Sequence, residues 1–173
     1  MTGIQFISRY FVPLILRTPN LLLTWRLIMV QKHTTHKFAK DQATRTEISD
    51  YMSSTIISVG PDSTVQETAQ FMHEKNIGSV LVKEDEDYIG IVTETDLSRK
   101  VLGGGMDPKT TKVTAVMTPQ PIVTLDCHQP VTEANAYMAK KKIRHLPVTE
   151  SGKIVGMISV KDLVAFFANP RLR

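Results

Sequence analysis

The sequence predicts a mixed α/β (α+β) fold built from two copies of one small module. The first observation is a motif, Gly-apolar-apolar-(Ser/Thr)-x-x-Asp, which occupies residues 90–96 and returns at residues 156–162. The second is that the offset of 66 residues between the motifs holds without a gap, so that residues 65–97 match residues 131–163. A repeat of this size is typical of duplicated supersecondary units. We therefore expect two modules of about 50 to 60 residues each, the size of small domains.

The first copy is expected to begin at residues 48–52 and to read strand, helix, strand, strand, helix. A short strand at 56–59 ends in the turn-forming run Gly60-Pro61-Asp62. Thr64 and Glu67 have the spacing of a capping box, which starts a helix with one apolar face. The remaining expected elements are a buried strand at 79–82, an acidic turn at 84–87, a strand at 88–93 and a helix at 96–102, which three glycines stop.

The second copy is expected to repeat this order after a linker at 106–112, with residues 113–117 entering it. Pro130 lies where the first turn of a helix tolerates proline, and apolar residues at helical spacing follow it. The expected strands are 122–125, 146–148 and 154–159, and the last helix is 162–168. On this basis the first domain spans residues 46–105 and the second spans residues 106–173.

Residues 1–45 form an N-terminal extension of basic and apolar character. Residues 1–40 contain six Lys and Arg and no acid, so the remaining 15 basic and 17 acidic residues give a balance of −2. The net charge of +4 therefore belongs to the extension, and nucleic acid is not an expected partner of the body. The uncharged apolar runs of the extension are shorter than the roughly 18 residues that a membrane span needs.

Three interpretations of the extension stay open. It is a disordered targeting peptide or interfacial membrane anchor, which its acid-free, Arg-bearing composition suits. Alternatively Met29 is the true start and residues 1–28 come from an upstream frame, or the extension has an ordered role. His33 and His36 could form a metal pair, but we expect them to be part of a polar tail.

The single cysteine, Cys127, excludes an internal disulfide and fits a reducing compartment. We therefore expect a cytoplasmic protein, with an organellar or membrane-associated location as the alternative if residues 1–28 are genuine. Membrane association is expected only through residues 1–30.

The repeated motif has two physical interpretations. On its own it is a capping box with Asp in place of Glu, in which Thr93 and Ser159 cap helices and Asp96 and Asp162 lie in the first turn. The motif also follows a strand at its carboxyl end, where α/β folds tend to bind ligands. A helix N-terminus attracts phosphate, and a carboxylate can accept hydrogen bonds from both hydroxyls of a ribose. The glycine that opens each motif leaves room for a close backbone approach, so the second interpretation is a nucleotide site.

With these motifs the sequence resembles tandem cystathionine-β-synthase (CBS) domains, an arrangement called a Bateman module. The resemblance covers roughly residues 46–168 and includes residues 77–82, 116–119 and 143–148. It implies two β-α-β-β-α repeats packed by pseudo-twofold symmetry. It also implies adenine nucleotides of the AMP, ADP, ATP, NAD or S-adenosylmethionine class as regulatory ligands in up to two clefts, and association into homodimers.

Each cleft of such a module borrows residues from both copies. By the resemblance, one cleft uses Ser159, Asp162, Arg144, His145, Ile57, Ile77 and Gly78. The other uses Thr93, Asp96, Gly78, Ser79, Val123, Ile143 and Arg144. The first has an Arg and a His at its phosphate end, where the second has Gly and Ser. Because a charge-assisted contact contributes roughly 1.5–3 kcal/mol, we expect the cleft with Asp162 to bind more tightly.

Two positions leave alternatives within this assignment. Thr95 departs from the resemblance, since relatives often carry Arg there, and Arg99 and Lys100 either compensate for it or are solvated. His145 is either a phosphate contact or a neutral core histidine.

The leading functional interpretation is a stand-alone regulatory module that binds an adenine nucleotide and signals to an unidentified effector protein, with no obligatory cofactor. The alternative is a structural dimerisation scaffold with empty clefts. An enzyme is the third class, since Cys127 and His128 are adjacent. No acid is spaced to orient them, however, and the sequence has no Walker loop, metal-ligand cluster or nucleophile elbow, so we expect no catalytic or metal site.

Overall fold

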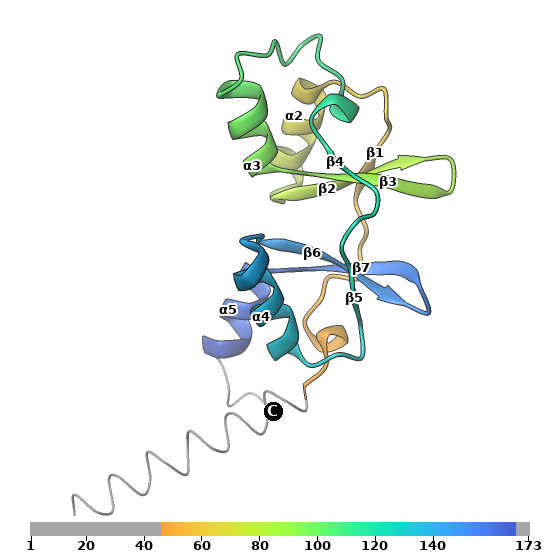
Figure 1. Cartoon of the computed structure of the whole chain (residues 1–173), viewed down its shortest axis with the longest axis vertical. Helices are drawn as coiled ribbons and strands as arrows, with labels where there is room; N and C mark the ends of the chain where they lie inside the picture. Colours follow the sequence, from red (N-terminus) through yellow and green to blue (C-terminus); the bar gives the residue numbers. More distant parts are fainter. Residues whose placement is uncertain (1–45, 169–173) are drawn as a thin grey trace, which may run out of the picture. The chain divides into compact units, whose positions relative to one another are not determined.

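The computed structural model describes residues 46–168, and the expectations for residues 1–45, including Met29, His33 and His36, lie outside them. Two β-α-β-β-α copies follow one another, as the sequence predicts (Figure 1). The first contains β1 (Ser58–Val59), α2 (Val65–Lys75), β2 (Ser79–Glu84), β3 (Asp87–Thr93) and α3 (Glu94–Asp96), which continues as the π-helical η3 (Leu97–Leu102). The second contains β5 (Leu125–Asp126), α4 (Val131–Lys141), β6 (His145–Glu150), β7 (Lys153–Ser159) and α5 (Val160–Ala168).

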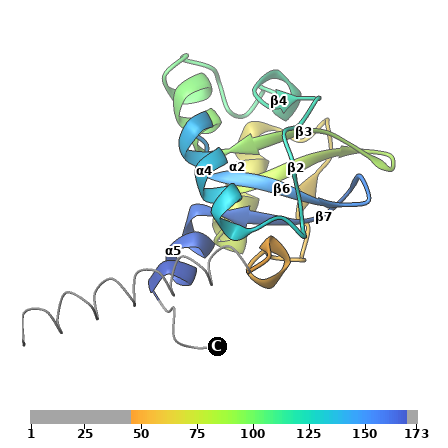
Figure 2. The same cartoon turned by 60° about the horizontal axis from the view of Figure 1, so that its bottom comes forward.

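Each copy has its own small sheet. The first has the order β1-β2-β3-β4, where β4 is Thr118–Pro119, and the second has the order β5-β6-β7. In each sheet the first strand is parallel to the second, and the second and third form an antiparallel hairpin. Figures 1 and 2 show the helices of each copy at one end of its sheet and the hairpin turn at the other. The mixed α/β prediction is confirmed, although the strand expected at 122–125 is only Leu125–Asp126, since these residues alone pair with β6.

The long helices of the two copies end alike but begin differently. The capping box predicted before α2 is present, because the Thr64 N–H donates to Glu67 Oε2 at 2.8 Å and the Glu67 N–H donates to Thr64 Oγ1 at 3.2 Å. Helix α4 starts after Pro130, which has no side-chain cap. Both helices end at a left-handed residue, Asn76 with φ 53° and Lys142 with φ 55°.

The entry segments are exchanged between the two copies. The segment with the short 3-10 turn η2 (Ile48–Asp50) packs on the second copy, where Ile48 is fully buried with Val131, Leu146 and Ile158. The segment with η4 (Val113–Ala115) packs on the first copy, where Val113 is fully buried with Val80 and Val92. Residues 48–52 precede the first copy in the chain and 113–117 precede the second, but each segment packs on the other copy, because the exposed edges of β3 and β7 each receive the segment of the other copy.

The glycines that open the repeated motif lie beneath these exchanged segments. A Cβ on Gly156 would lie 2.6 Å from the Ser53 carbonyl oxygen and 2.8 Å from the Met52 sulfur. A Cβ on Gly90 would lie 3.0 Å from the Thr118 carbonyl oxygen. The close backbone approach that the glycines predict is thus made by the protein itself.

Candidate functional site

The two Ser/Thr-x-x-Asp motifs form the same hydrogen bonds. The Thr93 N–H and hydroxyl donate to Asp96 Oδ2 at 2.9 and 2.6 Å. The Ser159 N–H and hydroxyl donate to Asp162 Oδ2 at 2.7 and 2.6 Å. In the first motif the Asp96 N–H also donates to Thr93 Oγ1 at 3.4 Å, which completes a capping box. In both motifs these bonds use only one oxygen of the carboxylate.

The other carboxylate oxygen distinguishes the two motifs. Asp96 Oδ1 lies 2.8 Å from Lys100 Nζ, which also donates to the Val116 carbonyl at 2.6 Å. Lys100 is thus tied to the first copy rather than solvated or free for a ligand, while Arg99 is exposed. Asp162 Oδ1 has no hydrogen-bond or ion-pair partner within residues 46–168. It therefore keeps an acceptor for a ligand hydroxyl.

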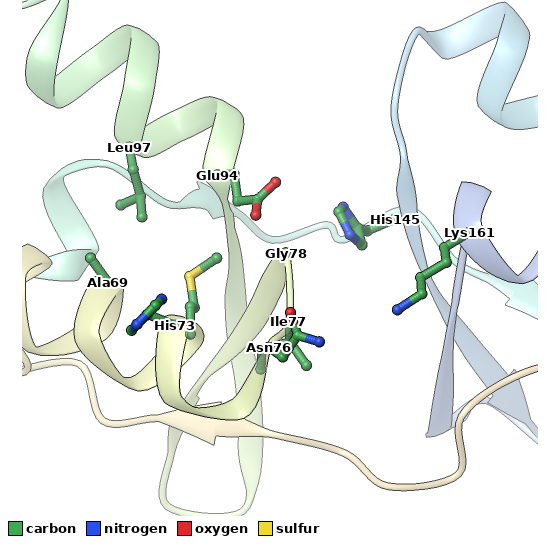
Figure 3. A pocket seen from close by; sticks show the side chains of 10 residues that line it. Ala69, His73, Asn76, Ile77, Gly78, Glu94, Leu97, His145 and Lys161 are labelled. Atoms are coloured by element: carbon green, nitrogen blue, oxygen red, sulfur yellow. The ribbon is translucent and has the colours of Figure 1, made fainter.

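A cavity of about 400 Å³ lies between residues of the two copies. Figure 3 shows its lining residues, which come mainly from the C-terminal end of α2 and the start of α3, with two side chains from the second copy. They are Ala69, Met72, His73, Asn76, Ile77, Gly78, Glu94, Leu97, His145 and Lys161. Of the predicted site residues, Ile77, Gly78 and His145 line this cavity.

Gly78 and His145 meet closely at the cavity. A Cβ on Gly78 would lie 2.8 Å from the Nε2 and Cε1 atoms of His145. The imidazole therefore occupies space that a larger residue at position 78 would fill. Burial, and then the charge of Arg144, lowers the pKa of His145 below its ordinary value. His145 is therefore a neutral, partly buried histidine at neutral pH, and it faces a cavity rather than the core alone.

Arg144 reaches the motif of the first copy. Its guanidinium donates to Thr95 Oγ1 at 3.0 Å and lies 3.8 Å from Glu94 Oε2. Thr95 is the position at which the resemblance leads one to expect Arg, so the second copy brings a cation to that place. In the second copy the matching position is Lys161, which is basic and lines the cavity.

The remaining predicted site residues do not line the cavity. Ile57 packs against the core of the first copy and Ile143 against that of the second. Ser79 is buried at the start of β2, opposite Thr93, and the side chain of Val123 is exposed.

Seven cavity residues are absent from the predicted site, and the four polar ones among them are His73, Asn76, Glu94 and Lys161. The match of Lys161 to Thr95 at the repeat offset was a usable signal for one of them. His73 and Asn76 carried no such signal, because only the packing of the end of α2 brings them to the cavity.

A second polar cluster surrounds His128. Its Nδ1 lies 2.9 Å from Glu47 Oε2, and its Nε2 lies 3.7 Å from Glu150 Oε1. The expectation that no acid orients His128 is therefore wrong, because the exchanged segment brings in Glu47 from 81 positions away in the chain. Cys127 is only 4% exposed, and burial together with the carboxylates of Glu150 and Asp126 raises the pKa of its thiol. The thiol is thus not prepared as a nucleophile.

No helix within residues 46–168 has the length and apolar character needed to cross a bilayer.

Comparison with known proteins identifies the fold family. The family model for the CBS domain matches residues 48–103 and 113–169. A protein of Methanopyrus kandleri is 37% identical over 111 residues, which cover 63% of this chain and 56% of that protein, so the chain spans little more than half of this relative.

A solved CBS-domain structure from Burkholderia ambifaria has a TM-score of 0.64 and 36% identity, and the match covers 69% of this chain and 86% of that one. The hexameric CBS-CP12 protein from bloom-forming cyanobacteria has a TM-score of 0.64 and 29% identity, with coverage of 73% and 75%. Both repeats are matched and the structural neighbours share the architecture, so this chain belongs to the CBS domain family, with two CBS domains in tandem.

Proposed function

We propose that this CBS pair is a regulatory module that binds an adenine nucleotide beside Asp162 and transmits the binding to an effector protein. The observation that carries the proposal is the free Oδ1 of Asp162, next to Lys161 and the cavity that Lys161 lines. Asp162 is also close enough for its negative charge to oppose the lowering of the pKa of His145, which lines the same cavity. A hydroxyl acceptor, a cation and an imidazole are thereby gathered at one place.

The cavity residues, together with Asp162, which adjoins Lys161 but does not itself line the cavity, suit the three parts of a nucleotide. The carboxylate of Asp162 would accept hydrogen bonds from ribose hydroxyls, and the ammonium group of Lys161 would bind phosphate. Met72 and Ile77 offer an apolar surface for the base. A volume of about 400 Å³ is within the range of roughly 300–1,000 Å³ that is usual for small-molecule sites.

The motif of the first copy is less available. Lys100 occupies the second oxygen of Asp96, and Arg144 is engaged with Thr95 and Glu94. A ligand there would have to displace a lysine that is also bound to a backbone carbonyl. We therefore propose that the site beside Asp162 is the tighter one.

The test is a ligand screen on the full chain with AMP, ADP, ATP, NAD and S-adenosylmethionine, by isothermal titration calorimetry and thermal unfolding. A ligand at a hundred times its dissociation constant should add about 2.7 kcal/mol of stability. Since 1 kcal/mol raises the Tm of a protein of this size by about 2–4 °C, the expected rise in Tm is roughly 5–11 °C. If none of the five ligands releases heat or shifts Tm, nucleotide sensing is rejected and the scaffold alternative gains support.

The scaffold alternative has its own supporting observation. Helix α5 exposes an apolar stripe, with Val160, Val164 and Phe167 being 39%, 60% and 50% exposed. Residues at this spacing lie on one face of a helix, and such a face suits a self-complementary contact between two copies of the chain. The hexameric relative is also an oligomer. We propose that the module is a homodimer in either case, and analytical ultracentrifugation of Val164→Asp should show a loss of the dimer.

We further propose that the role is binding rather than catalysis. The adjacent Cys127 and His128 are the enzyme-like feature of the sequence, and the Cys127 thiol is buried with a raised pKa. A nucleotide that is bound but recovered unchanged after prolonged incubation is the expected result. Turnover of ATP or NAD by the purified protein would contradict it.

A further inference from the structure

The second copy gathers metal-type donors at the end of its strands β5 and β6. Asp126, Cys127 and His128 offer donor atoms that all lie within 4.8 Å of one another. Glu150 ends β6 directly beside them, because β5 and β6 are paired at Asp126 and Thr149. The backbone holds this arrangement, since the Cys127 N–H donates to the Thr149 carbonyl at 2.8 Å.

The charges of this cluster do not balance. It contains the carboxylates of Glu47, Asp126 and Glu150, and within residues 46–168 no Lys or Arg forms an ion pair with any of them. His128 is the basic group that contacts two of them. At most one positive charge therefore faces three negative charges, which leaves a place for a cation.

The hydrogen bonds of His128 prepare one of its ring nitrogens for a metal ion. Glu47 Oε2 lies 2.9 Å from Nδ1 and suits a proton on that nitrogen, so in the neutral imidazole the lone pair lies on Nε2. Nε2 in turn lies 3.7 Å from Glu150 Oε1. A zinc ion bound at about 2.0–2.2 Å to each atom would need them roughly 3.3–3.7 Å apart at near-tetrahedral angles. The pair is thus spaced to hold one ion between them.

We propose that this cluster is a binding site for a divalent transition metal of the zinc type. His128 Nε2, Glu150, Asp126 and the Cys127 thiolate are the ligands, and Glu47 is a positioning residue that orients the imidazole. The mixed nitrogen, oxygen and sulfur donors favour zinc or its neighbours over magnesium or calcium. Binding of the ion releases the thiol proton of Cys127, which passes to solvent.

The first copy provides a natural comparison at the matching positions. There Gly60 and Pro61 stand in place of Asp126 and Cys127, and Asp62 stands in place of His128. The position of Glu47 is taken by Lys112, whose Nζ lies 2.6 Å from Asp62 Oδ1. The first copy thus has a lysine at this place and lacks the imidazole and thiol donors, so we expect one metal site per chain, in the second copy only.

The test is a zinc titration of the metal-stripped full chain by calorimetry, with His128→Gln and Glu150→Gln as variants. Both side chains are more than half exposed, so the variants should retain the fold, which thermal unfolding without metal will verify. Glu84→Gln is the matched control, because Glu84 holds the position of Glu150 in the first copy. We expect one zinc per chain, a loss of at least tenfold in affinity for each ligand variant, and no change for the control. Glu47→Gln should weaken binding roughly 10–100-fold.

Cobalt(II) supplies an independent readout of the ligands. Its complex with the wild-type chain should show a sulfur-to-metal charge-transfer band from Cys127, and His128→Gln should abolish it. The proposal is overturned if the chain binds no zinc, or if zinc binding survives in both ligand variants. A cobalt complex without the sulfur band would overturn the four-ligand assignment. This site is separate from the nucleotide site, so the outcome of either test leaves the other unaffected.

Discussion

The two CBS copies use one set of backbone contacts to hold side chains of opposite character. Each exchanged segment is held by equivalent hydrogen bonds, from the Val65 N–H to the Thr111 carbonyl and from the Val131 N–H to the Thr46 carbonyl, both at 2.9 Å. One residue further along, the first copy pairs Lys112 with Asp62, and the second pairs Glu47 with His128. The backbone and apolar residues therefore specify the duplicated fold, while the charges at matching positions are free to diverge.

The same divergence separates the two motifs. Four residues after Asp96 the first copy has Lys100, which binds the carboxylate. Four residues after Asp162 the second copy has Phe166, which is 8% exposed and packs edge-on against Tyr51 at a centroid distance of 5.0 Å. Both oxygens of the Asp96 carboxylate are therefore used within the protein, while Asp162 Oδ1 has no hydrogen-bond or ion-pair partner among residues 46–168. The two copies thus share the bonds from Thr93 or Ser159 to the aspartate and differ in what occupies its second oxygen.

The largest effect is expected for Asp162→Asn. Asparagine keeps a side-chain oxygen that accepts the hydrogen bonds from Ser159. It replaces the second carboxylate oxygen, which would accept hydrogen bonds from ribose hydroxyls, with an NH2 group and removes the negative charge. Loss of a charge-assisted hydrogen bond of about 1.5–3 kcal/mol corresponds to roughly a 10–150-fold weaker nucleotide affinity. Calorimetric titration with the best ligand of the screen measures this change.

Asp96→Asn is the matched control for that comparison. It should change the nucleotide affinity by no more than about twofold. It should lower Tm, because the Asp96 side chain is only 13% exposed and Lys100 loses this anionic partner. If Asp96→Asn weakens binding and Asp162→Asn does not, the assignment of the two copies is reversed.

Gly156→Ala should have the next largest effect, this time on folding. The added Cβ would lie 2.6 Å from the Ser53 carbonyl oxygen, a backbone atom that cannot turn away. Overpacking of this kind costs typically 1–3 kcal/mol. Urea unfolding of the variant should show this loss in the free energy of unfolding.

Gly90→Ala tests whether the two exchanged segments are equally tight. The nearest atoms to its added Cβ belong to the flexible side chain of Met117, and the Thr118 carbonyl oxygen lies 3.0 Å away. The loss should therefore be smaller than for Gly156→Ala. A larger loss for Gly90→Ala would show that the first copy, not the second, holds its segment more rigidly.

The periodic part of the fold was predictable from sequence, and the exchanged part was not. Apolar spacing and the capping box at Thr64 marked the helices and strands, because these signals are local in the chain. The exchange of residues 46–53 and 111–119 depends on which sheet edge is open. Two similar copies offer two such edges, and the sequence does not distinguish them.

The candidate site shows the same limit. The repeat identifies Asp96 and Asp162, and the capping box predicted at Thr93 and Asp96 is present. Their difference was hidden, because it depends on a lysine one turn later that also reaches a carbonyl of the exchanged segment. The partnership of Glu47 with His128 was hidden for the same reason, since only the exchange brings the two together.

A smaller effect is expected where the helices of the two copies begin. Thr64→Ala removes the hydroxyl that accepts the Glu67 N–H, and loss of such an N-cap costs about 1 kcal/mol. Thr64→Ser keeps the hydroxyl and is the matched control, with an expected change of a few tenths of a kcal/mol. Chemical denaturation distinguishes the two. If Thr64→Ala were as stable as Thr64→Ser, helix α2 would need its cap no more than α4, which begins at Pro130 without one.

The smallest effect concerns the pH dependence of stability at the cavity. Burial and the charge of Arg144 lower the pKa of His145 below its ordinary value of 6.5, against the opposing charges of Glu94 and Asp162. As the pH falls through 6.5, the unfolded chain therefore binds the proton before the folded chain does, and this group makes the fold less stable. His145→Gln removes the contribution, so the free energy of unfolding of the wild type should fall more steeply than that of the variant as the pH decreases below about 6.5. Other histidines contribute equally to both proteins and cancel in the difference. Parallel pH curves for the two proteins would show that the imidazole has the same pKa folded and unfolded, and that the cavity is wetter than its lining residues indicate.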